Sequence, residues 1–215
     1  PLDLNDVEIV SPHQARSIII LSEGSDPDSH VIKSTLAITN NPNRHAEPYH
    51  IVTSIRDPRN VSVIKMIGQK DIVQPILTSD LIARVVAQTS RQSGLSLVYT
   101  ELMDFGGDEI YFKQEPALSG KTYGESLLMF EDSCVIGIRK ADGTLMMNPP
   151  MDERIQAGDH IFAISEDDNT IRLSGNSKVP LDTPAIRSGG KSRAPKPEKC
   201  LILGWNVEGA TIIRE

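Results

Sequence analysis

The first half of the chain alternates continuous apolar runs with segments of helical periodicity. Strands are predicted at 17–21, 50–55 and 71–75, and helices at 30–39, 60–67 and 81–93. A continuous apolar run such as 17–21 is typical of a strand that is buried on both faces of a parallel sheet. Repeated alternation of strand and helix predicts a parallel α/β sheet, and three strands make about half of a doubly wound fold.

The segment 108–171 has a different pattern. Short apolar strands there are separated by turns rich in glycine, asparagine and proline, such as Ser119-Gly120 and Asn148-Pro149. One short helical piece is predicted between Gly120 and Phe130. This pattern indicates a small β-rich lobe that follows the α/β segment 1–107, which ends in a helix interrupted at Gly94.

The last part of the chain has the composition of a linker and then resumes an apolar pattern. Residues 172–198 contain repeated proline together with Ser188-Gly189-Gly190, which indicates a linker. The run 200–203, followed by Gly204, is interpreted as the first strand and turn of another βαβ unit. Because both ends of the sequence lie inside folded patterns, we expect the chain to be a piece of a longer protein.

Composition narrows the possible functions. The net charge is −7 and aromatic residues make up 4% of the chain, which argues against a basic, base-stacking nucleic-acid surface. No apolar stretch approaches the roughly 18 residues of a membrane span. Cys134 and Cys200 lie in apolar runs, so we expect both to be small buried hydrophobic residues, without a disulfide framework or zinc spacing.

Two glycine-containing motifs resemble nucleotide-binding turns. Ser119-Gly120-Lys121-Thr122 matches the end of a phosphate-binding loop, but Glu115 occupies the position that requires glycine. We therefore predict a turn into a short helix. In the segment 204–209, Asn206 replaces the middle glycine of G-x-G-x-x-G, which argues against dinucleotide binding. No grouping of nucleophile and base is visible, so catalysis is not predicted.

The candidate ligand site lies where the first two strands end. Ligands of open parallel sheets bind outside the carboxyl ends of the strands. The ligand-binding candidates at those ends are Ser22, Glu23, Asp28, Arg56 and Asp57, and the metal-binding candidates are Glu23, Asp26, Asp28 and Asp57.

Carboxylates facing such a crevice can coordinate a divalent cation or accept hydrogen bonds from ribose hydroxyls. The alternative is that these residues cap helices and stay solvated. Acidic residues also gather at 104–109 and 166–168, where no EF-hand spacing exists and a solvated acidic turn is the simpler interpretation.

Several of these segments together resemble the RCK (KTN/TrkA-type) regulatory region of CASTOR/POLLUX-like ion channels. The segments that carry the resemblance are the run 15–21, Arg91-Gln92-Ser93-Gly94-Leu95, the stretch 117–125, the Asn148-Pro149 turn, the stretch 158–168 and Leu203-Gly204-Trp205. The similarity extends over nearly the whole chain.

The resemblance implies a fold and a domain order. Residues 1–107 would be the later half of a Rossmann-like RCK lobe, and 108–171 a small TrkA-C-like α+β lobe. Residues 172–198 would be a linker, and 199–215 the truncated start of a second RCK unit. It also implies a cytoplasmic portion of a membrane protein that forms a tetrameric gating ring below an upstream pore. Ligands of such units include calcium and nucleotides.

The predicted function is therefore a ligand-sensing and gating or assembly domain of a potassium-type cation channel. Two alternatives remain open at this point. One is a fragment of a nicotinamide-dependent oxidoreductase, which would need a G-x-G-x-x-G turn before residue 1. The other is a module that only assembles subunits. The ion conducted, the ligand and the direction of gating do not follow from the residues.

Overall fold

The computed structural model describes residues 4–21, 24–175, 182–185 and 199–215. The chain divides into two compact units, residues 1–93 with 200–215 and residues 94–199. One unit contains a three-stranded parallel sheet and the other a four-stranded antiparallel sheet, so the predicted α/β class, with a parallel sheet followed by a small α+β lobe, is confirmed.

In the first unit, strands and helices alternate as the sequence predicted. Its elements are α1 (Leu4–Ile9), the 3₁₀ turn η1 (Pro12–Gln14), β1 (Ile18–Ile20), α2 (Pro27–Thr39), β2 (His50–Ile55), α3 (Pro58–Ile67), β3 (Ile72–Leu77), α4 (Thr78–Arg91) and α7 (Gly209–Arg214). The strands are parallel and ordered β1-β2-β3, with Ile20 beside Thr53 and Thr53 beside Pro75. Pro75 is tolerated because β3 is an edge strand.

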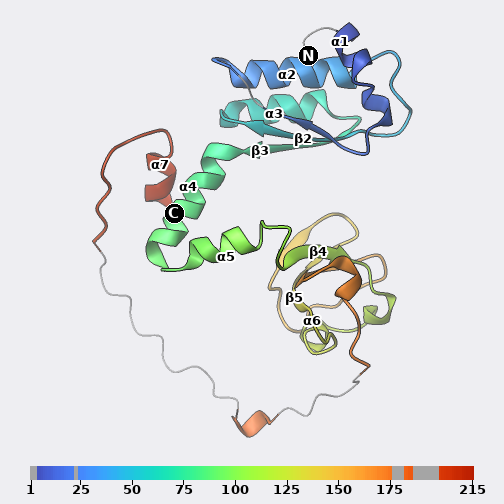
Figure 1. Cartoon of the computed structure of the whole chain (residues 1–215). Coiled ribbons are helices and arrows are strands. Elements are labelled where there is room, and N and C mark those ends of the chain that lie inside the picture. Colours follow the sequence, from blue (N-terminus) through green and yellow to red (C-terminus); the bar gives the residue numbers. More distant parts are fainter. Residues whose placement is uncertain (1–3, 22–23, 176–181, 186–198) are drawn as a thin grey trace. The chain divides into compact units, whose positions relative to one another are not determined.

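The core of this unit lies on one face of the sheet. Ile51 and Ile55 of β2 pack against Val31 of α2 and Ile64 of α3, and all four are fully buried. Figure 1 shows α2 and α3 on the same side of the strands. The expectation that the first strand is buried on both faces is wrong within the described chain, because Ile19 points to the other face and is 69% exposed.

The second unit is built on an antiparallel sheet ordered β4-β7-β5-β6. Its elements are α5 (Leu95–Glu101), β4 (Glu109–Lys113), η2 (Pro116–Leu118), α6 (Tyr123–Ser126), β5 (Cys134–Arg139), β6 (Leu145–Met147), β7 (His160–Ser165), η3 (Asp168–Thr170) and η4 (Thr183–Ala185). Leu118, Tyr123, Ile138 and Ile161 belong to its buried core.

The turn around Gly120 has the role that the sequence predicted. Gly120 has φ +84°, and Thr122 caps α6 by accepting the N–H of Glu125 at 3.2 Å. The Glu125 carboxylate accepts the N–H of Thr122 at 2.7 Å, which completes a capping box. The cap therefore accounts for the motif that resembled a phosphate-binding loop.

Residues 199–208 differ from their predicted secondary structure. They form no strand, because no described strand lies beside them to complete a hydrogen-bonded ladder. Instead the segment leads into α7, which packs on α4. Gly209 lies against the ring of Trp205, so an added Cβ would lie 3.0 Å from it. Whether these residues begin a second unit stays a prediction, as do the other domain assignments.

The expected burial of the cysteines is wrong. Cys134 and Cys200 are both exposed. Cys134 opens β5 on the face opposite the core, since the neighbouring Val135 is the side chain that points inward. Cys200 lies in an irregular segment and belongs to neither sheet of the described residues. In the described part of the chain, no helix has the length and apolarity needed to cross a membrane.

Candidate functional site

The carboxyl edge of the parallel sheet is organised by Asp28 in the first turn of α2. Asp26 is the N-cap of this helix and accepts the N–H of Ser29 at 3.4 Å, while Pro27 occupies its first turn. This arrangement points Asp28 toward the turn between β2 and α3, and its side chain is buried. The local sequence therefore begins α2 where a carboxylate can bridge two elements.

Asp28 is saturated by donors from the turn between β2 and α3. Its Oδ1 accepts the backbone N–H of Arg56 at 2.9 Å, and its Oδ2 accepts the N–H of Asp57 at 2.9 Å. The side-chain amide of Asn60 donates to Oδ2 at 2.8 Å. Burial by itself would raise the pKa of Asp28, but the donors from Asn60, Arg56 and Asp57 outweigh it and lower the pKa.

Asp57 has a local role at the start of α3. Its carboxylate caps the helix by accepting the N–H of Arg59 at 2.9 Å, and it also pairs with the Arg59 guanidinium at 2.6 Å. The hydrogen bonds from Arg59 lower the pKa of Asp57. Arg59 is 88% exposed, so this is a solvent-screened pair that contributes little to stability.

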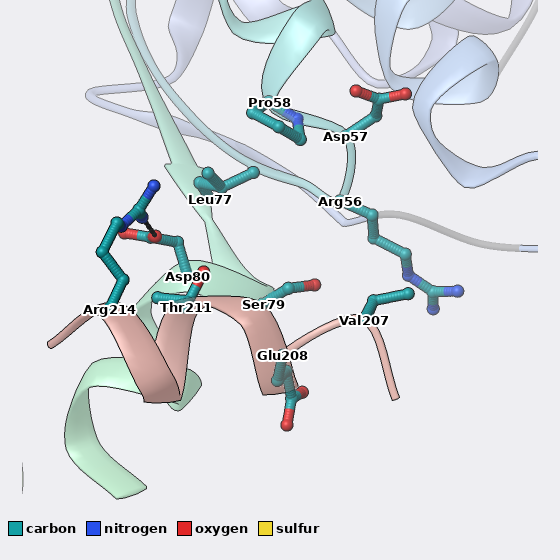
Figure 2. Close-up of a pocket in the computed structure, with 10 residues that line it drawn as sticks. All are labelled: Arg56, Asp57, Pro58, Leu77, Ser79, Asp80, Val207, Glu208, Thr211 and Arg214. Carbon is teal, nitrogen blue, oxygen red and sulfur yellow. Dashed lines mark ion pairs between the residues drawn. The ribbon is translucent and has the colours of Figure 1, made fainter. Parts of the chain in front are cut away.

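A cavity of about 740 Å³ lies beside these turns, within the first unit. Its walls come from the β2–α3 turn, the start of α4 and the C-terminal segment, shown in Figure 2. The lining residues are Arg56, Asp57, Pro58, Leu77, Ser79, Asp80, Val207, Glu208, Thr211 and Arg214. In Figure 2 the side chain of Arg56 reaches toward the C-terminal segment, whereas the Asp57 carboxylate points the opposite way.

Ion pairs hold the C-terminal wall of the cavity to α4. Arg84 contacts Asp80 at 2.7 Å on its own helix and Glu215 at 2.8 Å from the C-terminal segment. Arg214 approaches Asp80 at 4.0 Å. Asp80 therefore lies between two guanidinium groups, and hydrogen bonding to Asp80 is the main reason that the pKa of Arg84 is raised. The cavity has a mixed charge lining, with cations and carboxylates on facing segments.

The structure brings together three of the candidates from sequence, Asp28, Arg56 and Asp57. Arg56 and Asp57 line the cavity, but Asp28 has its oxygens committed to the turn beneath. Asp26 is exposed and caps α2. Ser22 and Glu23 lie outside the described residues. Among the residues that the structure describes, no group of three metal-ligating side chains is arranged to hold an ion.

Sequence reasoning missed the other walls of the cavity. The residue pattern predicted only a helix over 81–93 here, although Thr78-Ser79-Asp80 follows the third strand and so lies at the same carboxyl edge. That position was the available signal for Ser79 and Asp80. Nothing local indicates that Thr211 and Arg214, more than a hundred residues later, come to the same place.

A second hollow, of about 450 Å³, lies in the antiparallel unit and is lined by acidic residues. Glu109, Glu166 and Asp167 contribute to it. Asp167 caps η3 by accepting the N–H of Asp168 at 2.6 Å, and Asn169 donates to its other oxygen at 2.8 Å. Asp167 thus acts as a turn cap and Glu166 beside it is exposed, in agreement with the interpretation of a solvated acidic turn.

Comparison with known proteins identifies a family for part of this chain. The family described as "Castor and Pollux, part of voltage-gated ion channel" matches residues 79–180. Residues 79–180 are a Castor and Pollux domain. The predicted resemblance to CASTOR/POLLUX-type channels is thereby confirmed, and it extends beyond the matched domain.

The similarity to named relatives extends over nearly the whole chain. "Probable ion channel POLLUX" of Oryza sativa subsp. japonica is 31% identical over 214 residues, which are 95% of this chain and 21% of the relative. "Ion channel CASTOR" of Lotus japonicus is also 31% identical over 214 residues, covering 95% of this chain and 24% of its own length. The chain thus spans less than a quarter of either relative.

Among solved structures, the human SLO3 gating ring is similar in fold. Its TM-score is 0.62 at 18% sequence identity, and the match covers 80% of this chain and 36% of the SLO3 chain. At this identity the likeness concerns the fold alone.

Proposed function

We propose that the chain is a cytoplasmic ligand-sensing and gating region of a potassium-type cation channel, assembled as a homo-oligomeric ring below a pore elsewhere in the same polypeptide. The observation that carries the proposal is the 31% identity to proteins named as ion channels over 95% of the chain. The SLO3 structure, a gating ring of similar fold, supports a ring-shaped assembly, for which we propose a tetramer. In this proposal the chain is not an enzyme.

The cavity at the carboxyl edge is the proposed ligand site. A volume of about 740 Å³ falls in the range of small-molecule pockets. The guanidinium groups of Arg56 and Arg214 are suited to bind phosphate oxygens, which favours a nucleotide. Asp57 and Glu208 are suited to a cation such as calcium, although Asp57 already pairs with Arg59.

A ligand in this cavity would act by holding three segments together. Such a ligand shifts a gating equilibrium only through different affinities for two arrangements of its site. The β2–α3 turn, the start of α4 and the C-terminal segment each contribute to the cavity wall. A change in how α7 packs on α4 would therefore change the affinity, and binding would in turn favour one packing.

Exposed apolar side chains on α4 support assembly with other copies. Leu81, Ile82 and Val86 are 45%, 50% and 45% exposed, while Ala83 and Ala87 supply the buried side of the helix. Soluble helices seldom leave such a stripe to water unless another surface covers it. A purely structural assembly module stays the second candidate for this reason.

The experiment uses the full-length channel in liposomes, with ion flux measured while calcium alone, ATP or NAD is titrated. We expect one of these probes to change flux, and Arg56→Gln with Asp57→Asn to raise its half-effective concentration about tenfold, a loss of about 1.4 kcal/mol. Asn at position 57 keeps an acceptor for the α3 cap. Arg16→Gln, an exposed cation outside the cavity lining, is the matched control.

Three results would decide against the proposal. Absence of flux through the reconstituted full-length protein would reject the channel assignment. Flux that none of the three probes alters would favour the purely structural module. Turnover of NADH by the full-length protein would favour the oxidoreductase alternative.

A further inference from the structure

The antiparallel sheet has one face turned toward its core and one face turned away from it. Tyr111, Val135, Ile138 and Ala163 point to the core side, together with α6 and the loops around it. Because side chains alternate along a strand, their neighbours in sequence form the opposite face. We call this opposite face the outer sheet face. It comprises Ile110, Phe112, Cys134, Gly137, Arg139, Leu145, Met147, His160, Phe162 and Ile164.

An apolar row crosses all four strands at the centre of the outer sheet face. In register, Phe112 lies beside Phe162, Phe162 beside Gly137, and Gly137 beside Met147. The two phenylalanine rings are 5.4 Å apart. A Cβ at position 137 would lie 2.2 Å from the ring of Phe162, so the glycine is what lets that ring lie across the sheet.

Apolar side chains are exposed on the two edge strands of this face. On β4, Phe112 is 46% exposed and Ile110 42%. On β6, Leu145 is 60% exposed and Met147 68%, whereas Phe162 between the edge strands is 4% exposed. Exposed apolar surface that flanks a buried ring in this way is suited to packing against another sheet, at about 10 Å separation.

Charge is divided between the two ends of the same face. At one end, Arg139 lies 4.7 Å above the ring of Phe112 and pairs with no carboxylate of the described chain. At the other end are the exposed acids Asp108, Asp132 and Glu166, next to the termini of β4, β5 and β7. These acids likewise form no ion pair among the described residues.

We propose that the outer sheet face is an interface between two copies of this chain, related by a two-fold axis that lies between the faces and runs across the strands. This axis stacks each strand antiparallel on its own mate, so the central apolar rows meet. It also places Arg139 of one copy over the acidic end of the partner, near Asp132. Each such contact forms twice by symmetry.

The charge pattern selects this partner and this orientation. A two-fold axis along the strands would put the acidic ends together, which is unfavourable. The axis across the strands instead pairs Arg139 with an acidic end, and neither has an ion-pair partner inside the described chain. A second copy therefore matches the first both in its apolar row and in its charge pattern.

The interface joins two copies as a pair, so a tetrameric ring would contain two such pairs with other contacts between them. It rests on the proposed function only in taking the partner to be another copy of the chain. Its test involves neither ligand nor ion flux. Loss of ligand response with association intact would count against the proposed function alone. A chain that stays monomeric would count against the interface alone.

The first test measures the mass of the 215-residue chain by sedimentation velocity over a range of concentrations, with reductant present because Cys134 lies on this face. We expect concentration-dependent dimerisation, and Phe112→Glu to weaken it at least tenfold. Leu128→Glu is the matched control, since Leu128 is 41% exposed but lies outside the outer sheet face. Thermal melting checks that each variant is folded.

The second test exchanges the charges. Arg139→Glu and Asp132→Arg should each weaken dimerisation, and the double variant Arg139→Glu/Asp132→Arg should restore it. Asp152→Arg, an exposed acid in the loop that packs on α6, is the control and should have no effect. Equal association of wild type and Phe112→Glu, or a double variant as weak as the sum of the single ones, would overturn the proposed interface.

Discussion

The carboxylate of Asp28 accepts a hydrogen bond from the side-chain amide of Asn60 at 2.8 Å, across 32 residues of sequence. The same carboxylate accepts the backbone N–H groups of Arg56 and Asp57. One buried side chain in α2 therefore sets the position of the turn that supplies two cavity residues. The candidate site depends on this contact although Asp28 does not line the cavity.

Removing the Asp28 carboxylate should loosen that turn. We expect Asp28→Ala to lower the free energy of unfolding by about 1–3 kcal/mol, because three donors lose a charged acceptor. Chemical denaturation measures the change. Asp26→Ala, which removes a weaker and exposed cap at 3.4 Å, is the comparison and should cost less. Equal losses in the two variants would contradict the role assigned to Asp28.

The lowered pKa of Asp28 predicts a pH dependence with a definite sign. Its folded-state pKa lies below the ordinary aspartate value of about 3.9, so the unfolded chain takes up the proton first as pH falls. The stabilisation is complete above that ordinary value and is lost as pH falls through the folded-state pKa. Melting from pH 7 to pH 2 should show a smaller acid-induced loss in Asp28→Asn than in wild type.

Gly137 should tolerate no side chain. An added Cβ would lie 2.2 Å from the Phe162 ring and 2.4 Å from the carbonyl oxygen of Met146, and the latter is backbone that cannot rotate away. We expect Gly137→Ala to destabilise the chain by about 1–3 kcal/mol through overpacking. Gly106→Ala, where the nearest atom would be 3.7 Å away, is the control measured by the same thermal melts. An unchanged melting temperature for Gly137→Ala would refute the prediction.

Two aspartate–arginine pairs should differ in their effect on stability because they differ in burial. Asp71 is 1% exposed, contacts Arg44 at 2.7 Å and accepts the N–H of Tyr49 at 2.8 Å. Arg44→Ala would leave that buried charge without its cation, at a cost of about 3–5 kcal/mol. Arg59→Ala removes the exposed partner of Asp57 and should have little effect. Urea unfolding of both variants compares them directly.

Packing of α7 on α4 should depend on Arg84. This residue holds Glu215 at 2.8 Å and Asp80 at 2.7 Å. Arg84→Ala is expected to increase amide hydrogen exchange in residues 209–214 while the strands of the parallel sheet keep their protection. Arg91→Ala, at the far end of the same helix, is the control. Unchanged exchange in 209–214 would show that these ion pairs do not hold the segment.

Much of the local architecture could be predicted from the residues. The apolar runs gave the three parallel strands, and Gly94 gave the break before α5. The helices predicted at 30–39 and 60–67 are present but begin earlier, at Pro27 and Pro58. These features follow from backbone preferences that act within a few residues. The family resemblance rested on the same kind of short motifs and was confirmed by the Castor and Pollux match.

The site was predicted only in part, because its residues come together through distant contacts. Arg56 and Asp57 could be predicted because ligands of parallel sheets bind at the carboxyl ends of the strands. Thr211 and Arg214 reach the cavity only through the packing of α7 on α4. Asp28 was a candidate ligand by its position, but the fold commits its oxygens to the β2–α3 turn. Which carboxylates stay available to a ligand therefore depends on hydrogen-bond donors more than 25 residues away in sequence.

Periodicity, turn chemistry and capping, which are local, determined the alternation of elements, the two types of sheet and the capped turn after Gly120. Burial and pairing were decided by tertiary structure. Cys134 is exposed because of the face it occupies, and the run 200–203 forms no strand because a strand requires a neighbour. Local preferences act through one residue's backbone, whereas burial and pairing require surfaces that only the folded chain brings together.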